Sequence, residues 1–233
     1  MSVNNPWQDL PQSAPYLLPG DRAAVEQFNS KLTPEDKHRL RTYLPPLPFQ
    51  GRIDAPIVLL GLNPGYAELD DVKHVTPAFL EANRRNYAHE SADYPFFFLD
   101  PQYAGDAGQK WWHTRLGRLR QESKHKGAFS DKQLTKSLLS VQYFPYRSQE
   151  FKQMTKLDSQ QYGFALVKQA MDHNAVIILL RSRTLWESAV EGLAQYCNLL
   201  AASNERNPVL SPEQLGEEGW QKLVTALQAG AQS

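Results

Sequence analysis

The sequence APIVLLGLNPG occupies residues 55–65. Its apolar part, Pro56 to Leu60, is short, carries no charge and ends at Gly61. Such a run is typical of a strand buried on both faces, and strands of this kind belong mostly to parallel sheets covered by helices. The turn that follows places backbone amides and the polar Asn63 side chain at the carboxyl end of the strand. Ligands bind at that edge of open α/β sheets, although Asn-Pro-Gly also forms an ordinary β-turn.

Three more apolar segments predict strands, and helical patterns separate them. The strands are expected from Leu138 through Arg147, over 175–180 and over 196–202. Helices are expected over 21–30, 33–44, 76–87, 110–122, 159–173, after Arg183, and from Ser211 to about residue 227. This alternation predicts right-handed crossovers and a three-layer αβα fold with a short, mainly parallel sheet of four strands. We expect residues 1–44 to form an N-terminal extension that packs on an α/β domain of residues 45–233.

Composition excludes several classes of protein. The chain has 233 residues, 41% of them hydrophobic, which is enough for a sizeable core. The single cysteine, Cys197, excludes an intramolecular disulfide. Neither a signal peptide nor an apolar stretch of membrane length is visible, so we expect a cytoplasmic protein. The histidines show no metal-ligand spacing, and no phosphate-binding or dinucleotide motif is present, so we expect neither a metal nor a cofactor.

The strand followed by Gly-Leu-Asn-Pro-Gly and an aromatic residue resembles the first active-site motif of the uracil-DNA glycosylase superfamily, particularly its mismatch-specific branch. The resemblance implies a four-stranded parallel core and hydrolysis of the N-glycosidic bond of a deaminated or mismatched base that is flipped out of DNA. It also implies that Asn63 orients the attacking water. The implied contacts to the base come from the same loop, at Gly61, Leu62, Pro64, Gly65 and Tyr66.

A second motif is expected after the last strand. The family carries His-Pro-Ser there, or Asn-Pro-Ser-Gly-Leu-Ser in the mismatch-specific branch, and residues 207–211 (Asn-Pro-Val-Leu-Ser) are similar to the latter. No histidine is present, and Val-Leu replaces Ser-Gly. The candidates here are Asn204 and Asn207 for catalysis, with Ser203, Pro208 and Leu210 as substrate contacts. Val209 and Leu210 at a loop tip would wedge into a base stack, whereas Asn-Pro is equally a plain turn before a helix.

Three side chains outside these motifs complete the predicted site. Gln142 lies at the end of the second strand. In several branches of the glycosylase superfamily an asparagine near this position reads the edge of the base, and glutamine offers the same hydrogen-bond donors and acceptors on a longer side chain. One ring among Tyr94 and Phe96–Phe98, with Phe97 as the candidate, would stack on the base, although such an aromatic run also suits a core. Arg181 follows the third strand and suits a phosphate or carboxylate.

Basic residues far outnumber acidic ones between Lys110 and Lys156, although the whole chain is neutral. Such segregation predicts a DNA-contacting face, although a solvated helix face gives the same pattern.

Two alternatives to a glycosylase stay open. One is a module of the same fold that binds a nucleobase, nucleotide or nucleic acid without catalysis. The other is an enzyme that acts on a small metabolite and binds its anionic group through Arg181 and Arg183.

Overall fold

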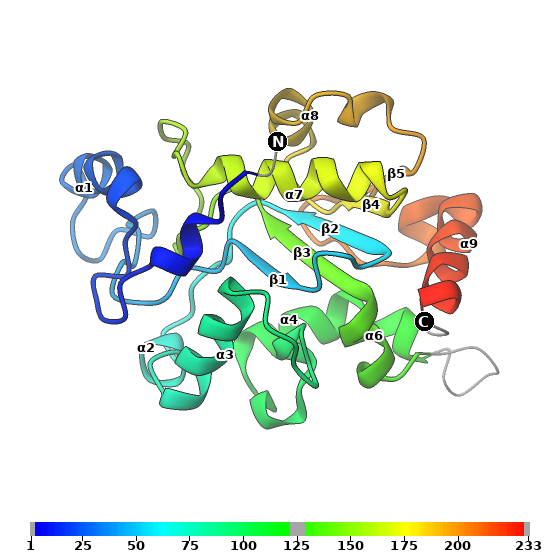
Figure 1. Cartoon of the computed structure of the whole chain (residues 1–233), viewed down its shortest axis with the longest axis horizontal. Coiled ribbons are helices and arrows are strands. Elements are labelled where there is room, and N and C mark those ends of the chain that lie inside the picture. The colour runs from blue at the N-terminus through cyan, green and yellow to red at the C-terminus, as the bar shows by residue number, and fades with distance from the viewer. Residues whose placement is uncertain (1–2, 122–128, 231–233) are drawn as a thin grey trace.

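The computed structural model describes residues 3–121 and 129–230 and places a central sheet between two layers of helices (Figure 1). The sheet has five strands in the order β1-β3-β2-β4-β5. Strands β2 to β5 run parallel, whereas β1 pairs antiparallel with β3 at the edge. The strands are β1 (Phe49–Gly51), β2 (Ile57–Gly61), β3 (Leu138–Gln142), β4 (Val176–Leu179) and β5 (Leu199–Ala201). The predicted α/β class is confirmed, and the expected four-stranded sheet is replaced by a mixed sheet of five strands.

Helices follow the predicted alternation with strands. The described helices are α1 (Arg22–Asn29), α2 (Asp70–Lys73), α3 (Pro77–Tyr87), α4 (Ala107–Arg115), α5 (Gly117–Gln121), α6 (Asp131–Ser137), α7 (Gln160–Asp172), α8 (Arg183–Ala189) and α9 (Pro212–Gly230). The predicted helix over 110–122 is divided into α4 and α5, and residue 122 lies outside the described part. Helix α6 was not predicted, although the spacing of Ser130 and Gln133 signals the capping box that starts it. None of the described helices is both long and apolar enough to span a membrane.

The central strand β2 supplies both halves of the core. All five of its residues are buried, and because side chains alternate along a strand, they divide between the two faces. Val58 and Leu60 pack toward α7, α8 and the N-terminal segment, which lie on one side of the sheet in Figure 1. Ile57 and Leu59 pack toward α3, α4, α6 and α9 on the other side. Burying each such side chain contributes about 1.5–3 kcal/mol, which explains the uninterrupted apolar run.

Residues 3–44 contribute to the same core as the sheet. Trp7, Leu17 and Leu40 are buried in the cluster that contains Val58 and Leu60. The buried Asp21 carboxylate joins the segment to the rest of the chain, since it accepts hydrogen bonds from the Tyr146 hydroxyl at 2.8 Å and from the Ser159 amide at 3.1 Å. Residues 3–44 therefore complete one face of the sheet.

Two predicted elements differ from the structure. The helix expected over 33–44 is absent, and this described segment consists of turns. The Asn29 side chain bonds to both the amide and the carbonyl of Leu40, at 2.9 and 3.0 Å. This tertiary contact occupies the backbone groups that a helix would use. The second strand stops at Gln142, and the chain beyond it turns through Pro145 instead of extending to Arg147.

Candidate functional site

A cavity of about 260 Å³ lies at the carboxyl ends of β2, β3 and β4. This is the edge where ligands bind in open α/β sheets. Its volume falls just below the range of about 300–1,000 Å³ for pockets that hold drug-sized ligands, so a ligand of nucleobase size fits it. Eight sequence-predicted residues line it together: Gly61, Leu62, Asn63, Pro64, Gly65, Tyr66, Gln142 and Arg181.

Asn63 is held in one orientation by the chain opposite. Its Nδ2 atom donates to the Ser148 carbonyl at 3.3 Å and lies 3.2 Å from the Ser148 hydroxyl. A carbonyl only accepts hydrogen bonds, so this contact identifies which end of the amide faces Ser148. No described residue donates to Asn63 Oδ1. That oxygen is therefore free to accept a hydrogen bond from a water or a ligand.

Gln142 packs over the start of the same turn. A Cβ atom at position 61 would collide with the Gln142 amide, so glycine there lets the amide pack directly against the backbone. Gln142 Oε1 is buried and has no hydrogen-bond partner among the described residues. A buried acceptor without a partner is unusual in a folded protein, and it lies in a side chain that lines the cavity.

Two arginines bring positive charge to the cavity, and only one of them was predicted. Arg181 is half-buried, donates through Nη2 to the Arg206 carbonyl at 3.0 Å, and has no partner for Nε. Arg147 was missed as a site residue, and it is 2% exposed. Burial lowers the pKa of both guanidinium groups. Both nevertheless remain charged, because the ordinary pKa of arginine lies far above neutral pH.

A buried acidic and imidazole cluster adjoins Arg147. His74 Nε2 lies 3.0 Å from Asp106 Oδ2 and 3.6 Å from Asp70 Oδ1, and all three side chains are nearly inaccessible. Asp70 and His74 line the cavity. Their oxygen and nitrogen atoms form a set that could hold a cation, although Arg147 already places a positive charge 3.8 Å from Asp70 Oδ2. The spacing of Asp70 and His74, four residues apart, is the signal that could have indicated this cluster.

Acid is expected to destabilise the fold through His74. Burial lowers the pKa of its imidazole, and Arg147 acts in the same direction, while the hydrogen bond to Asp106 opposes them. A pKa that is lower in the folded state makes the unfolded state bind the proton first. The free energy of unfolding therefore falls as the pH drops below about 6.5, and levels off below the folded-state pKa. Burial is the largest single influence on Asp106 and acts to raise its pKa, but the hydrogen bonds from His74 and the Gly108 amide, together with nearby positive charge, lower that pKa overall, so Asp106 adds a fall at more acidic pH.

The measurement is the urea midpoint of the wild type and of His74→Gln between about pH 7 and about pH 5. We expect the variant to lose less stability over this interval than the wild type does. Burial also lowers the pKa of His89 and His113, so some dependence on pH remains in the variant. An identical loss in both proteins would contradict the assignment to His74.

Aromatic rings form one wall of the cavity, and the structure corrects which ring of the aromatic run belongs there. Phe98, Trp111 and Trp112 line the cavity, and the two tryptophans meet edge to face at 4.6 Å between ring centroids. Phe97 does not line it. Its buried ring packs against Phe79 and lines a different cavity. The prediction that Phe97 stacks on a base at the predicted edge is therefore wrong, and Phe98 lies in the expected place.

The predicted second motif lies outside the cavity. Ser203, Asn204 and Asn207 are exposed and do not line it. The Asn204 side chain accepts hydrogen bonds from the amides of residues 206 and 207, which makes it an Asx turn. Asn207 Oδ1 accepts from Arg115 Nη2 at 3.2 Å. Both asparagines therefore hold the local structure of the loop.

Leu210 does not lie at a loop tip, and neither does Pro208. Pro208 is buried, and Leu210 is fully buried in the core on the α9 side of the sheet. The predicted wedge is therefore wrong, because Leu210 is needed to fill the core. Exposed apolar side chains occur instead just after the Asn63 turn, where Leu69 and Val72 are 63% and 69% exposed.

Several basic side chains of the segment 110–156 are buried or paired with acidic residues in the described part of the chain. Arg147 is buried, and Arg120 and Lys132 pair with Asp131 and Asp93. Lys136 lines a cavity at the amino ends of the strands, away from Asn63. Lys124 and Lys126 lie outside the described residues.

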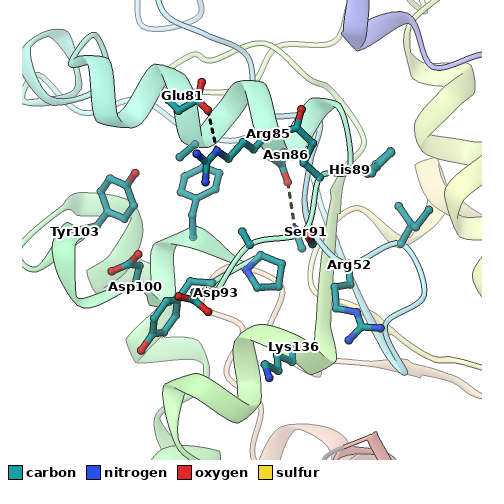
Figure 2. A pocket seen from close by; sticks show the side chains of 18 of the residues that line it. Arg52, Glu81, Arg85, Asn86, His89, Ser91, Asp93, Asp100, Tyr103 and Lys136 are labelled. Carbon is teal, nitrogen blue, oxygen red and sulfur yellow. Dashed lines mark hydrogen bonds and ion pairs between the residues drawn. The ribbon is translucent and has the colours of Figure 1, made fainter. Parts of the chain in front are cut away.

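That other cavity, of about 900 Å³, lies between α3, the β1–β2 connection and the segment from residue 89 to 103 (Figure 2). Two ion pairs lie within this lining: Arg85 with Glu81 at 2.8 Å, and Arg52 with Asp54 at 2.6 Å. His89 Nε2 lies 2.7 Å from the Tyr162 hydroxyl. Among the described residues that line this cavity, only His89 has a buried side-chain atom without a partner, Nδ1, whereas five side chains that line the Asn63 cavity have one.

The chain matches no protein-family model, no curated protein and no solved structure. What the site can do chemically therefore follows from its own residues. The cavity combines an amide oxygen free to hold water, an unpartnered amide acceptor, two guanidinium groups and an aromatic wall. This combination suits a small planar ligand with hydrogen-bonding groups around its edge.

Proposed function

We propose that this chain is a DNA glycosylase-like protein that takes a deaminated or mismatched base into the cavity and hydrolyses its N-glycosidic bond. The observation that carries the proposal is the set of buried polar atoms that have no partner among the described residues and belong to side chains lining this cavity: Asp70 Oδ1, His74 Nδ1, Gln142 Oε1, Arg147 Nη2 and Arg181 Nε. Nearly all buried polar groups in folded proteins are hydrogen-bonded. A nucleobase presents donors and acceptors in one plane and would satisfy several of these atoms together.

Each side chain then has a distinct role. The aromatic wall of Phe98 and Trp111 stacks on the flat faces of the base, a contact worth about 1–3 kcal/mol per base. The Gln142 amide reads the edge of the base. Asn63 Oδ1 holds the water that attacks the sugar carbon, and such positioning lowers the barrier without a strong base.

DNA is the proposed partner that delivers the base. The exposed Leu69 and Val72 follow directly on the Asn63 turn, where apolar side chains would occupy the gap left in a base stack. Arg181, at the carboxyl edge of the sheet, would meet a phosphate.

A module that binds a base or nucleotide without catalysis is the second candidate. One observation favours it: Ser203, Asn204 and Asn207, the residues of the expected second motif, lie outside the cavity. Under this alternative the same unpartnered atoms hold the ligand, and no hydrolysis follows.

The deciding experiment is a glycosylase assay on labelled oligonucleotides. Substrates carry uracil, hypoxanthine, xanthine, or G·U and G·T mismatches, and alkali then cuts any abasic site. The protein is prepared from cells that lack the host uracil glycosylase. We expect cleavage of at least one substrate. Intact strands across the whole panel, together with thermal stabilisation by a base or nucleotide, would contradict the enzyme and favour the binding module.

A further inference from the structure

Arg147 is a buried cation with few partners of its own. A guanidinium group carries five N–H donors. In Arg147, Nε donates to the Pro45 carbonyl at 2.9 Å. Nη1 lies 3.8 Å from Asp70 Oδ2, beyond hydrogen-bond distance, and Nη2 has no partner among the described residues. One N–H of the five is therefore used, in a side chain that is 2% exposed.

Such a group is poised to receive an acceptor. A buried charged donor without a partner costs more free energy than a neutral one, and nearly all buried polar groups in folded proteins have a hydrogen-bond partner. Arg147 lines the same cavity as Asn63 and Gln142. The acceptor that would complete it is therefore expected in that cavity, beside the water held by Asn63.

The Asp70 carboxylate lies near the Arg147 guanidinium but does not form a hydrogen bond with it. Asp70 Oδ2 accepts a hydrogen bond from the Ala67 amide at 3.0 Å, so its position depends on the loop that follows Asn63. At 3.8 Å from Nη1 it attracts the guanidinium but leaves the N–H groups unbonded. Arg181, by contrast, already donates through Nη2 to the Arg206 carbonyl and is less deeply buried.

We infer that Arg147 donates to the oxygen of the departing base that carries its negative charge. This inference rests on the proposed function. The bond between the sugar carbon C1′ and the base nitrogen breaks, and both electrons go to the base, where they delocalise onto a neighbouring carbonyl oxygen. The water held by Asn63 adds its oxygen and one hydrogen to C1′, and its other hydrogen ends on the base. A preorganised positive charge in a site shielded from water stabilises that developing anion.

The first test uses binding of free bases, which requires no turnover. Uracil is neutral in mildly alkaline buffer, whereas 5-nitrouracil is ionised, and calorimetry measures the affinity of each. We expect the wild type to bind the ionised base on the order of 10- to 100-fold more tightly, as one charge-assisted hydrogen bond allows. Arg147→Met should abolish this preference, and Arg147→Lys should keep part of it, because lysine retains the charge but loses the planar fork. Arg39→Met is the matched control, since Arg39 donates to the carbonyls of Asn29 and Leu32 and does not line the cavity.

Each outcome decides the inference. Equal affinity of the wild type for both bases would overturn it, whether or not the protein cleaves DNA. A preference that survives Arg147→Met would assign the charge to another group. Where Arg147→Met does not fold, the wild type alone decides: its affinity for 5-fluorouracil should rise as the pH passes through the ionisation of that base, and a constant affinity would overturn the inference.

The second test is the leaving-group dependence of cleavage. Fluorine makes 5-fluorouracil a better leaving group than uracil, so a cation that stabilises the departing base matters less for it. Arg147→Met should therefore lose more activity on uracil than on 5-fluorouracil in DNA. Equal losses on both would assign Arg147 a structural role. Absence of cleavage by the wild type contradicts the proposed function instead, and it leaves the binding preference as the test of Arg147.

Discussion

Asn63→Ala is expected to lower the rate of base release about 10²–10³-fold, the loss typical when one positioned polar group is removed from an active site. The reason is the orientation of its amide. Nδ2 is fixed by the Ser148 carbonyl at 3.3 Å, which leaves Oδ1 for the attacking water. Alanine removes both the anchor and the acceptor. The affinity for a free base should change little, because the aromatic wall, Gln142 and Arg147 remain.

The measurement is single-turnover cleavage of the substrate that the wild type processes, with calorimetry of the free base beside it. Asn198→Ala is a suitable control, because Asn198 also donates through Nδ2 to a backbone carbonyl, that of Asn174 at 3.3 Å, and does not line the cavity. Cleavage that survives Asn63→Ala would remove Asn63 from the reaction. A parallel loss of base affinity would mean that Asn63 contacts the base itself.

Trp186→Ala is expected to destabilise the fold by about 3–5 kcal/mol, the usual cost of deleting a large buried ring. Trp186 is fully buried on α8. Its ring packs edge to face against Tyr143 and Phe164, with centroids 5.4 and 5.9 Å away. Its Nε1 atom donates to the Gly61 carbonyl at 2.9 Å, where β2 ends and the Asn63 turn begins. We therefore expect a lower affinity for bases as well as a lower stability.

Urea denaturation with linear extrapolation measures this change. Trp186→Phe should cost less, because the ring volume is mostly kept and the Gly61 carbonyl still accepts from the Tyr143 amide at 3.1 Å. Leu69→Ala, at a position 63% exposed, should stay within about 0.5 kcal/mol of the wild type. A Trp186→Ala midpoint equal to that of Leu69→Ala would refute the anchoring role.

Part of the cavity could be predicted without coordinates. Parallel strands bring their carboxyl ends to one edge of the sheet, so residues that follow different strands meet there. Asn63 follows β2, Gln142 is the last residue of β3, and Arg181 follows β4. All three line the cavity. The three residues lie close together because their strands are neighbours and run in the same direction. Short apolar runs separated by helical patterns already indicate that common direction.

Other members of the cavity were beyond sequence reasoning. Arg147 belonged to a basic segment that predicted a DNA face, yet its guanidinium is buried beside Asp70. His74 was one of several scattered histidines, and only the fold brings it within 3.0 Å of Asp106, which lies 32 residues away. These contacts join loops whose paths no local pattern specifies.

The α/β class and the meeting of Asn63 with Gln142 and Arg181 could be inferred from the sequence, because buried strands and amphipathic helices leave periodic apolar patterns. Which apolar and charged side chains are covered depends on tertiary packing. Leu210 is buried and Leu69 is exposed, although both lie in loops. The antiparallel strand β1 and the turns over 33–44 were decided in the same way. The physical reason is that burial and backbone pairing depend on what packs against a segment, and those partners come from distant parts of the chain.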